Sequence, residues 1–173
     1  IVSYEDEGNG DYGTAIVGTV SGTSISFGTA AVFESASMRE TSTTYDANAN
    51  RVVVAYCDSA NSSYGTAAVG TVSGTSISFG TPVVFESANS SEMRVVYHVA
   101  AKKPVISYRD SGNSGYITAI VGTVSGTSIS FNTPSVLKSV GSSSVGSVYD
   151  ASADNVVVAF YDESGGDGTA VVY

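Results

Sequence analysis

A ten-residue segment, GTVSGTSISF, occurs three times without a single change, beginning at Gly18, Gly70 and Gly122. The copies begin 52 residues apart, and flanking segments such as VSYED at Val2 and VAYCD at Val54 keep the same spacing. A fixed period of about this length indicates a repeat architecture, in which each period is one supersecondary unit. The single domain 1–173 therefore divides into repeats at residues 2–53, 54–105 and 106–157, with a partial repeat at residues 158–173.

Each repeat predicts four antiparallel strands. In the best example, a short strand ends at Tyr45 and Asp46, and the β-branched run RVVVAYCD from Arg51 forms the second strand. The third strand is GTAAVGTV from Gly65, and the fourth is TSISFGTPVVF from Thr75. Ser-Gly between the third and fourth strands predicts a two-residue hairpin turn, and ANAN between the first and second predicts an Asn/Asp turn. No segment has a helical period.

Four antiparallel strands in a repeat of this length are the signature of a β-propeller blade. The run VVVAY is apolar on both faces, which suits a strand covered by neighbouring blades on both sides. The sequence therefore predicts an all-β propeller built from 52-residue four-stranded blades, with about 3.3 repeats per chain. A β-solenoid or an open stack of hairpins is the alternative, although a solenoid coil usually needs fewer residues.

The chain does not contain a whole number of blades. About three and a half blades are present, whereas propellers usually have four to eight. Unpaired strand edges at both ends favour pairing between chains, so we expect a homo-oligomer that completes a propeller ring. A small four-bladed ring closed by one chain, or a fragment of a longer repeat array, would also account for the count.

Composition restricts the partners. Charged residues make up only 13% of the chain, about half the usual share, so hydroxyl groups supply most of the polar surface, as is typical of extracellular and virion β-proteins. The net charge is −9 with seven basic residues, which excludes the basic stripe that a nucleic-acid partner requires. No apolar run approaches the roughly 18 residues needed to cross a membrane, so we expect no membrane partner.

Candidate catalytic residues are scarce, and we expect no enzymatic activity. The one histidine, His98, occupies the repeat position of Asp46 and Asp150, and we interpret it as a drifted turn residue rather than a catalytic base. The one cysteine, Cys57, has no intrachain disulfide partner. Its equivalents in the other repeats differ widely: Glu5, Arg109 and Tyr161. A position that accepts such different residues is predicted to be exposed.

The turns after the second strand of each repeat are the best candidates for ligand binding. They share an aspartate, small polar residues and, in three copies, a tyrosine, which gives the candidate residues Asp6, Tyr12, Asp58, Tyr64, Asp110 and Tyr116. Sugars offer hydroxyls and an apolar CH surface, which a carboxylate and an aromatic ring match, and several weak sites gain by avidity. The alternative is that the aspartates cap the turns and the tyrosines pack between blades.

The same turns give a weak signal for calcium. Asp58 is followed three residues later by Asn61, as in a short calcium loop. The full spacing of such a loop and its distal bidentate glutamate are missing, and an Asx turn explains the same residues. We therefore predict no metal site and no cofactor, with calcium as the alternative.

Three segments differ between repeats: Ser35 to Thr44, Ala88 to Val96 and Val140 to Val148. Each links the fourth strand of one blade to the first strand of the next. We expect connecting loops here, which are frequent sites of recognition but are also free to drift.

The consensus VVVAYxDxxNxxYGTAxVGTVSGTSISFGTPVVFES, with GTPVVFES at Gly80 to Ser87, resembles repeats of predicted structural proteins from marine bacteriophages and uncultured marine bacteria. The resemblance covers nearly the whole chain. It implies a propeller-type domain of a tail fibre or a secreted adhesin, and it implies no catalytic residue.

Taken together, these features favour a non-enzymatic, lectin-like binding module for carbohydrates or cell-surface glycans. The alternative is a structural repeat that serves assembly and binds no small molecule.

Overall fold

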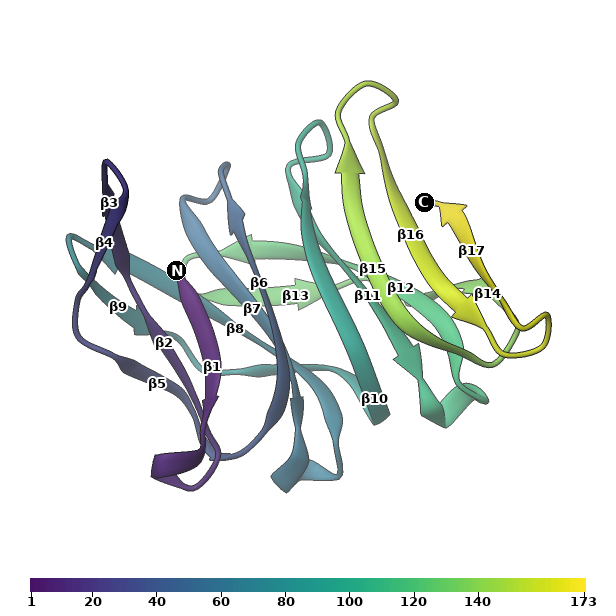
Figure 1. Ribbon diagram of the computed structural model, residues 1–173, viewed down its shortest axis with the longest axis horizontal. Helices are drawn as coiled ribbons and strands as arrows, with labels where there is room; N and C mark the ends of the chain where they lie inside the picture. Colours follow the sequence, from purple (N-terminus) through teal and green to yellow (C-terminus); the bar gives the residue numbers. More distant parts are fainter.

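The computed structural model describes residues 1–173 as an all-β chain, in which 69% of the residues lie in strands and 5% in helical turns. The strands form a curled, half-barrel arrangement (Figure 1). The prediction of an all-β fold is therefore confirmed. No helix is long and apolar enough to cross a membrane.

The strands form four antiparallel units that follow one another along the chain. Unit 1 contains β1 (Val2–Asp6), β2 (Tyr12–Ile16) and β5 (Ala31–Ser37), with the hairpin β3 (Gly18–Ser21) and β4 (Ser24–Phe27). Unit 2 contains β6 (Arg39–Asp46), β7 (Arg51–Asp58), β8 (Tyr64–Ser73), β9 (Ser76–Phe79) and the first half of β10 (Val83–His98). Unit 3 contains the second half of β10, β11 (Lys103–Asp110), β12 (Tyr116–Ser125), β13 (Ser128–Phe131) and β14 (Ser135–Lys138). Unit 4 contains β15 (Ser142–Asp150), β16 (Asn155–Asp162) and β17 (Asp167–Val172).

Strand β10 belongs to two units. Residues from Val83 to Asn89 pair with β8, and residues from Ser90 to His98 pair with β11, so units 2 and 3 join in one nine-stranded sheet. The prediction of a connecting loop at Ala88 to Val96 is therefore wrong. The corresponding segments in the other repeats also lie mostly in strands, namely β5, β6 and β15. The backbone hydrogen bonds of these segments go to the neighbouring strands, which removes the need for a surface loop.

The repeated decamer forms a hairpin with a two-residue turn in each copy, but the turn residues are Gly-Thr, one position beyond the predicted Ser-Gly. Ser73 pairs with Ser76, and Gly74 at the first turn position has φ 58°. Gly22 and Gly126 have φ 61° and 63°, values that suit glycine at this position of a hairpin turn. The predicted fourth strand is interrupted beside Pro82, so β9 pairs with the end of β8 and β10 pairs with its beginning.

The hydrophobic core is divided into three clusters, one between each pair of consecutive units. Between units 1 and 2, Ala15 and Phe33 pack with Val54 and Tyr56. The opposite face of β7 contributes Val53 to the cluster with unit 3. Strand β7 is thus covered on both faces, which explains why its sequence is apolar without alternation.

Two buried tyrosines connect consecutive units. The hydroxyl of Tyr56 donates to Glu34 Oε2 at 2.8 Å, and that of Tyr108 donates to Glu86 Oε2 at 3.0 Å. Burial, followed by the adjacent glutamate, raises the pKa of both phenols. In unit 4 Phe160 takes the position of these tyrosines, and Lys138 takes the position of Glu34 and Glu86. Both members of the pair therefore change together.

The outer hairpins stack on one another through glycine. A Cβ atom on Gly28 would lie 1.8 Å from the carbonyl oxygen of Thr75 in the next hairpin, and one on Gly80 would lie 2.0 Å from that of Thr127. Asn132 stands at the equivalent position after the third decamer, where no fourth hairpin follows. Close contact between neighbouring hairpins thus accounts for the glycine that follows the first two copies.

We expect Gly80→Ala to lower the free energy of unfolding by about 1–3 kcal/mol, because the new methyl group must displace a turn carbonyl of the next unit. Asn132→Ala, the matched control in the third copy, should change it by less than about 0.5 kcal/mol. Chemical denaturation followed by circular dichroism measures both. Equal effects of the two substitutions would contradict the stacking of the hairpins.

Candidate functional site

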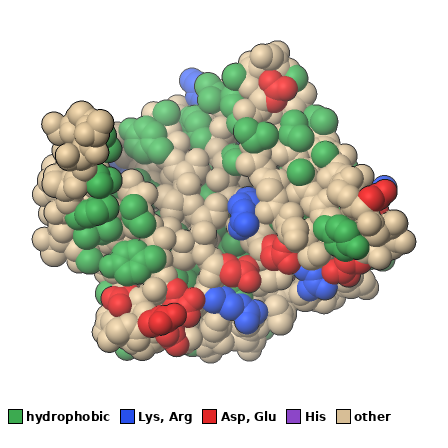
Figure 2. Space-filling view, in the orientation of Figure 1, with side chains coloured by type: hydrophobic (Ala, Val, Ile, Leu, Met, Phe, Trp, Pro, Cys, Tyr) green, Lys and Arg blue, Asp and Glu red, His purple; other side chains and the backbone are tan.

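The predicted ligand-binding turns lie along one edge of the molecule, at the bottom of Figure 1, where the first three form short 3₁₀ segments. These are η1 (Glu7–Asn9), η2 (Ser59–Asn61) and η3 (Ser111–Asn113). The turn between β16 and β17 is the fourth member of the series. We call this set of turns the loop edge. Most of the acidic side chains visible in Figure 2 also lie toward this edge.

The turns of units 1 to 3 share one backbone path. In each, two consecutive residues with positive φ precede the tyrosine; in unit 2 these are Ser62 (φ 58°) and Ser63 (φ 60°) before Tyr64. The carbonyl of Ser63 accepts the amide of Ser90 at 2.9 Å, which holds the turn against β10. The equivalent bonds in the neighbouring units are Met38 to Asp11 and Ser142 to Gly115. The chain thus presents three turns of the same form side by side.

The aspartates of the loop edge have two kinds of surroundings. Asp58 and Asp110 are buried, and each accepts a backbone amide at 3.1 Å, from Asn61 and Asn113 respectively. These carboxylates therefore close their own turns. Asp6 is half-buried and makes no such hydrogen bond, so its carboxylate remains available.

The tyrosines of the loop edge, Tyr12, Tyr64 and Tyr116, are each half-buried and begin β2, β8 and β12. The fourth turn differs from the others. Asp162 pairs with Asp167, whereas Asp110 pairs with Tyr116, so this turn is one residue shorter and has aspartate in place of tyrosine. Hydrogen bonds from the Ser164 hydroxyl and the Gly165 amide hold the pKa of Asp162 below its usual value. The structure therefore brings the predicted residues to one edge, in three similar turns.

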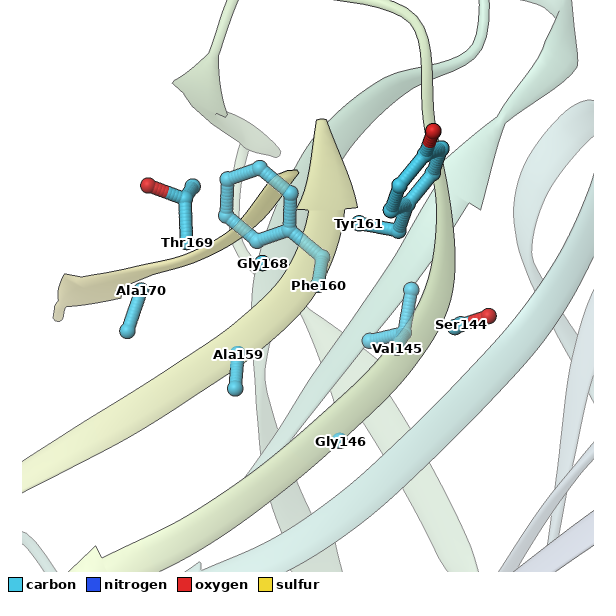
Figure 3. A pocket seen from close by; sticks show the side chains of 9 residues that line it. All are labelled: Ser144, Val145, Gly146, Ala159, Phe160, Tyr161, Gly168, Thr169 and Ala170. Atoms are coloured by element: carbon cyan, nitrogen blue, oxygen red, sulfur yellow. The ribbon is translucent and has the colours of Figure 1, made fainter. Parts of the chain in front are cut away.

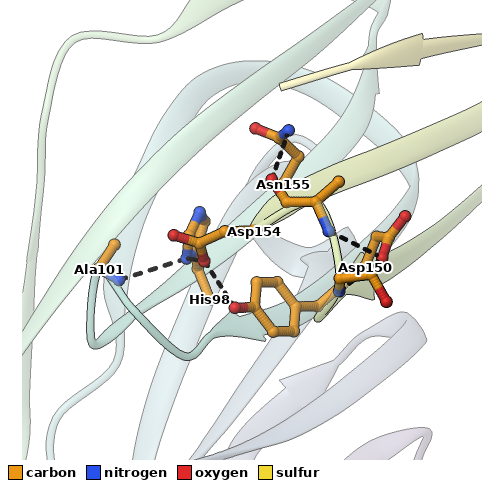
Figure 4. Close-up of polar contacts among 8 residues, drawn as sticks. His98, Ala101, Asp150, Asp154 and Asn155 are labelled. Carbon is orange, nitrogen blue, oxygen red and sulfur yellow. Dashed lines mark hydrogen bonds and ion pairs between the residues drawn. The ribbon is translucent and has the colours of Figure 1, made fainter.

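His98 lies at the opposite edge, where it ends β10 just before the turn to β11 (Figure 4). Its Nδ1 atom accepts the amide of Ala101 at 3.3 Å. Asp46 and Asp150 accept turn amides in the equivalent turns. The His98 ring also packs against the Tyr149 ring in a tilted arrangement, with ring centroids 5.0 Å apart. Histidine thus replaces the aspartate as the acceptor of this turn, as its position in the repeat predicts.

Cys57 is fully buried in the cluster between units 2 and 3, so the prediction of an exposed position is wrong. Burial is the largest influence on its thiol and raises the pKa. The equivalent Glu5 and Tyr161 are exposed, and Tyr161 lies on the face of unit 4 that no further unit covers. The residue type at this repeat position therefore differs because its burial differs from unit to unit, and not because the position is exposed in every unit.

Two glutamates that the sequence did not single out connect the inner strands. Glu40 and Glu92 occupy β-bulges with φ 52° and 54°, at equivalent positions of β6 and β10. The Glu40 carboxylate accepts the amide of Glu92, and the Glu92 carboxylate accepts the amide of Val145 at 3.0 Å. The only sign of this pair in the sequence is its spacing of 52 residues. The sequence does not show where the β-bulges lie, so it gives no reason to prefer these two carboxylates to others.

The chain contains no group of three or more His, Cys, Asp or Glu side chains that could hold a metal ion. The chemistry available at the loop edge is hydrogen bonding by turn amides, hydroxyls and carboxylates, together with contact by tyrosine rings. No family model, curated protein or solved structure matches this chain.

Proposed function

We propose that this chain is a non-enzymatic module that binds carbohydrate through the loop edge, without a cofactor. The observation that carries the proposal is the threefold presentation of the same turn, with a half-buried tyrosine at its end. A tyrosine ring offers an apolar surface for the CH face of a sugar, and adjacent turn groups offer partners for its hydroxyls. Three equivalent turns also suit a ligand with repeated sugars.

Different residues of the turns have different roles in this proposal. Tyr12, Tyr64 and Tyr116 contact the ligand, and the available carboxylate of Asp6 contributes to the first site. Asp58 and Asp110 act as positioning residues, because each already holds a turn amide. The net charge of −9 opposes anionic ligands, so we assign the module to uncharged glycans.

We infer that the four units are consecutive blades of a β-propeller. Support comes from the antiparallel order of strands within each unit and from the core clusters between the faces of consecutive units. The proposal includes an extracellular or virion location. Few charged residues and a surface rich in hydroxyls agree with that setting.

The test is binding of the wild-type chain to an array of uncharged glycans. Replacing Tyr12, Tyr64 and Tyr116 together with alanine should abolish binding, and replacing one should weaken it by about tenfold or more through lost avidity. Tyr45→Ala is the control, because Tyr45 is an exposed tyrosine that lies near the opposite edge. Absence of glycan binding by the wild type, or an equal loss in the control, would refute the proposal.

A structural repeat without a ligand is the second candidate. The turn-closing bonds of Asp58 and Asp110 favour it, because they assign these aspartates to folding. If this candidate is correct, alanine at Asp58 lowers the free energy of unfolding by about 1 kcal/mol, as the loss of a cap does, while no binding activity exists to be lost.

A further inference from the structure

The outer face of unit 1 exposes apolar side chains that are covered in the units that follow. Val2, Ile25 and Phe27 are 45%, 52% and 54% exposed. Their equivalents in unit 2 lie against unit 1: Val54 at 0%, Ile77 at 6% and the half-buried Phe79. The same three positions of unit 3, Ile106, Ile129 and Phe131, pack against unit 2. Unit 1 therefore exposes the apolar face that, in units 2 and 3, packs against the preceding unit.

The outer face of unit 4 is the complementary case. Tyr161 and Val172 are 43% and 65% exposed, whereas their equivalents Cys57 and Val69 are buried between units 2 and 3. The register establishes the equivalence, because Val172 pairs with Val157 as Val69 pairs with Val53. The face of unit 4 that carries Tyr161 and Val172 is therefore uncovered, whereas the same face of unit 2 is covered by unit 3.

An apolar hollow marks this face of unit 4. Its lining includes Val145, Ala159, Tyr161, Gly168 and Ala170, which Figure 3 shows around the strands β15, β16 and β17. Gly168 pairs with Tyr161 as Gly65 pairs with Cys57. A Cβ atom on Gly65 would lie 2.5 Å from the ring of Phe85, but one on Gly168 would have nothing within 4 Å. In unit 2 this place is covered by the ring of Phe85 from the first half of β10, and unit 4 has no corresponding strand beside β17.

We propose that the outer face of unit 4 is the docking surface for unit 1 of a second copy of this chain, packed head to tail as the units pack within one chain. The internal contacts are the basis for this occupant. The chain already joins two such faces between units 1 and 2 and again between units 2 and 3, with matching residues at the contact. The exposed Phe27 of the second copy would supply an aromatic ring near the hollow, as Phe79 meets Phe33 at 5.4 Å between units 1 and 2.

This contact is heterologous, since two different faces meet. An open assembly consequently retains one free unit 1 face at one end and one free unit 4 face at the other, so it either closes into a ring or extends into a filament. The contact does not depend on whether the loop edge binds a glycan. Its failure and the failure of glycan binding are therefore separate results.

The test is the native mass of the wild-type chain by light scattering over a dilution series. We expect a mass at least twice the 17.5 kDa of one chain. Phe27→Asp removes the unit 1 face, and Val172→Asp removes the unit 4 face; each variant should be monomeric. Mixing the two variants should restore a pair of one copy each, because the intact unit 4 face of the first meets the intact unit 1 face of the second.

Val84→Asp is the matched control and should keep the wild-type mass. Val84 is 41% exposed although units 1 and 3 flank it, and its equivalents Val32 and Val136 are 44% and 45% exposed. The three aspartates replace exposed side chains, and circular dichroism verifies that each variant is folded. A wild-type chain that stays monomeric would overturn the proposal and assign the hollow to a different partner. Single variants that still associate would also overturn it, because they would require a contact between other faces.

Discussion

Raising the pH from about 10 to about 12 is expected to lower the free energy of unfolding by about 5 kcal/mol, a large part of the stability of a domain of this size. The cause is the pair of buried phenols, Tyr56 and Tyr108, whose pKa values are raised in the folded chain. Above pH 10 these groups lose protons in the unfolded chain but keep them in the folded chain. Each phenol therefore removes about 1.4 kcal/mol per pH unit until the pH reaches its pKa in the folded state.

The variant with both Tyr56→Phe and Tyr108→Phe tests the origin of this decline. Unit 4 already has phenylalanine at this position, in Phe160, so the packing accommodates the change. Near neutral pH the variant should lose about 0.5–1.5 kcal/mol for each hydrogen bond to Glu34 or Glu86. In alkali its stability should fall much less steeply than that of the wild type, because the buried Cys57 thiol still has a raised pKa but the two phenols are gone. Denaturant titrations at several pH values measure both effects, and an equally steep decline in the variant would assign the alkaline sensitivity to other groups.

The sequence predicted features that depend on contacts within one repeat. The period, the β-branched second strand, the hairpin at Gly74 and the turn between Asp46 and Arg51 all follow from neighbouring residues. It did not predict that the segment from Ala88 to Val96 continues a strand. That strand pairs with β8 and then with β11, and residues outside the segment determine both pairings.

The same distinction applies to the candidate site. The common position of the three turns could be predicted, because equivalent parts of a repeat lie at the same edge. The closing of the turns by Asp58 and Asp110 was only one of two open interpretations, since a carboxylate in a turn suits a cap and a ligand equally. The burial of Cys57 could not be predicted from its own repeat, because unit 3 is what covers it.

Gly65 and Phe85 should show strong energetic coupling. Gly65→Ile alone is expected to lower the free energy of unfolding by about 3 kcal/mol, because even the first atom of the new side chain would lie 2.5 Å from the Phe85 ring. Phe85→Leu alone should cost about 1–2 kcal/mol through the space left beside glycine. Unit 3 contains both changes at once, with a fully buried Ile117 and Leu137 in the same cluster.

The double variant should therefore be more stable than Gly65→Ile alone, with a coupling energy of about 2 kcal/mol. Isoleucine also suits a strand better than glycine, which loses about 0.5–1 kcal/mol of stability in such a position. Denaturant titrations of the wild type, both single variants and the double variant complete the cycle. If the two effects simply add, the ring over the glycine does not determine the packing of unit 2. If they couple as expected, the ring of Phe85 determines the packing beside Gly65, and Gly168 in unit 4 differs because no strand of its own unit covers it.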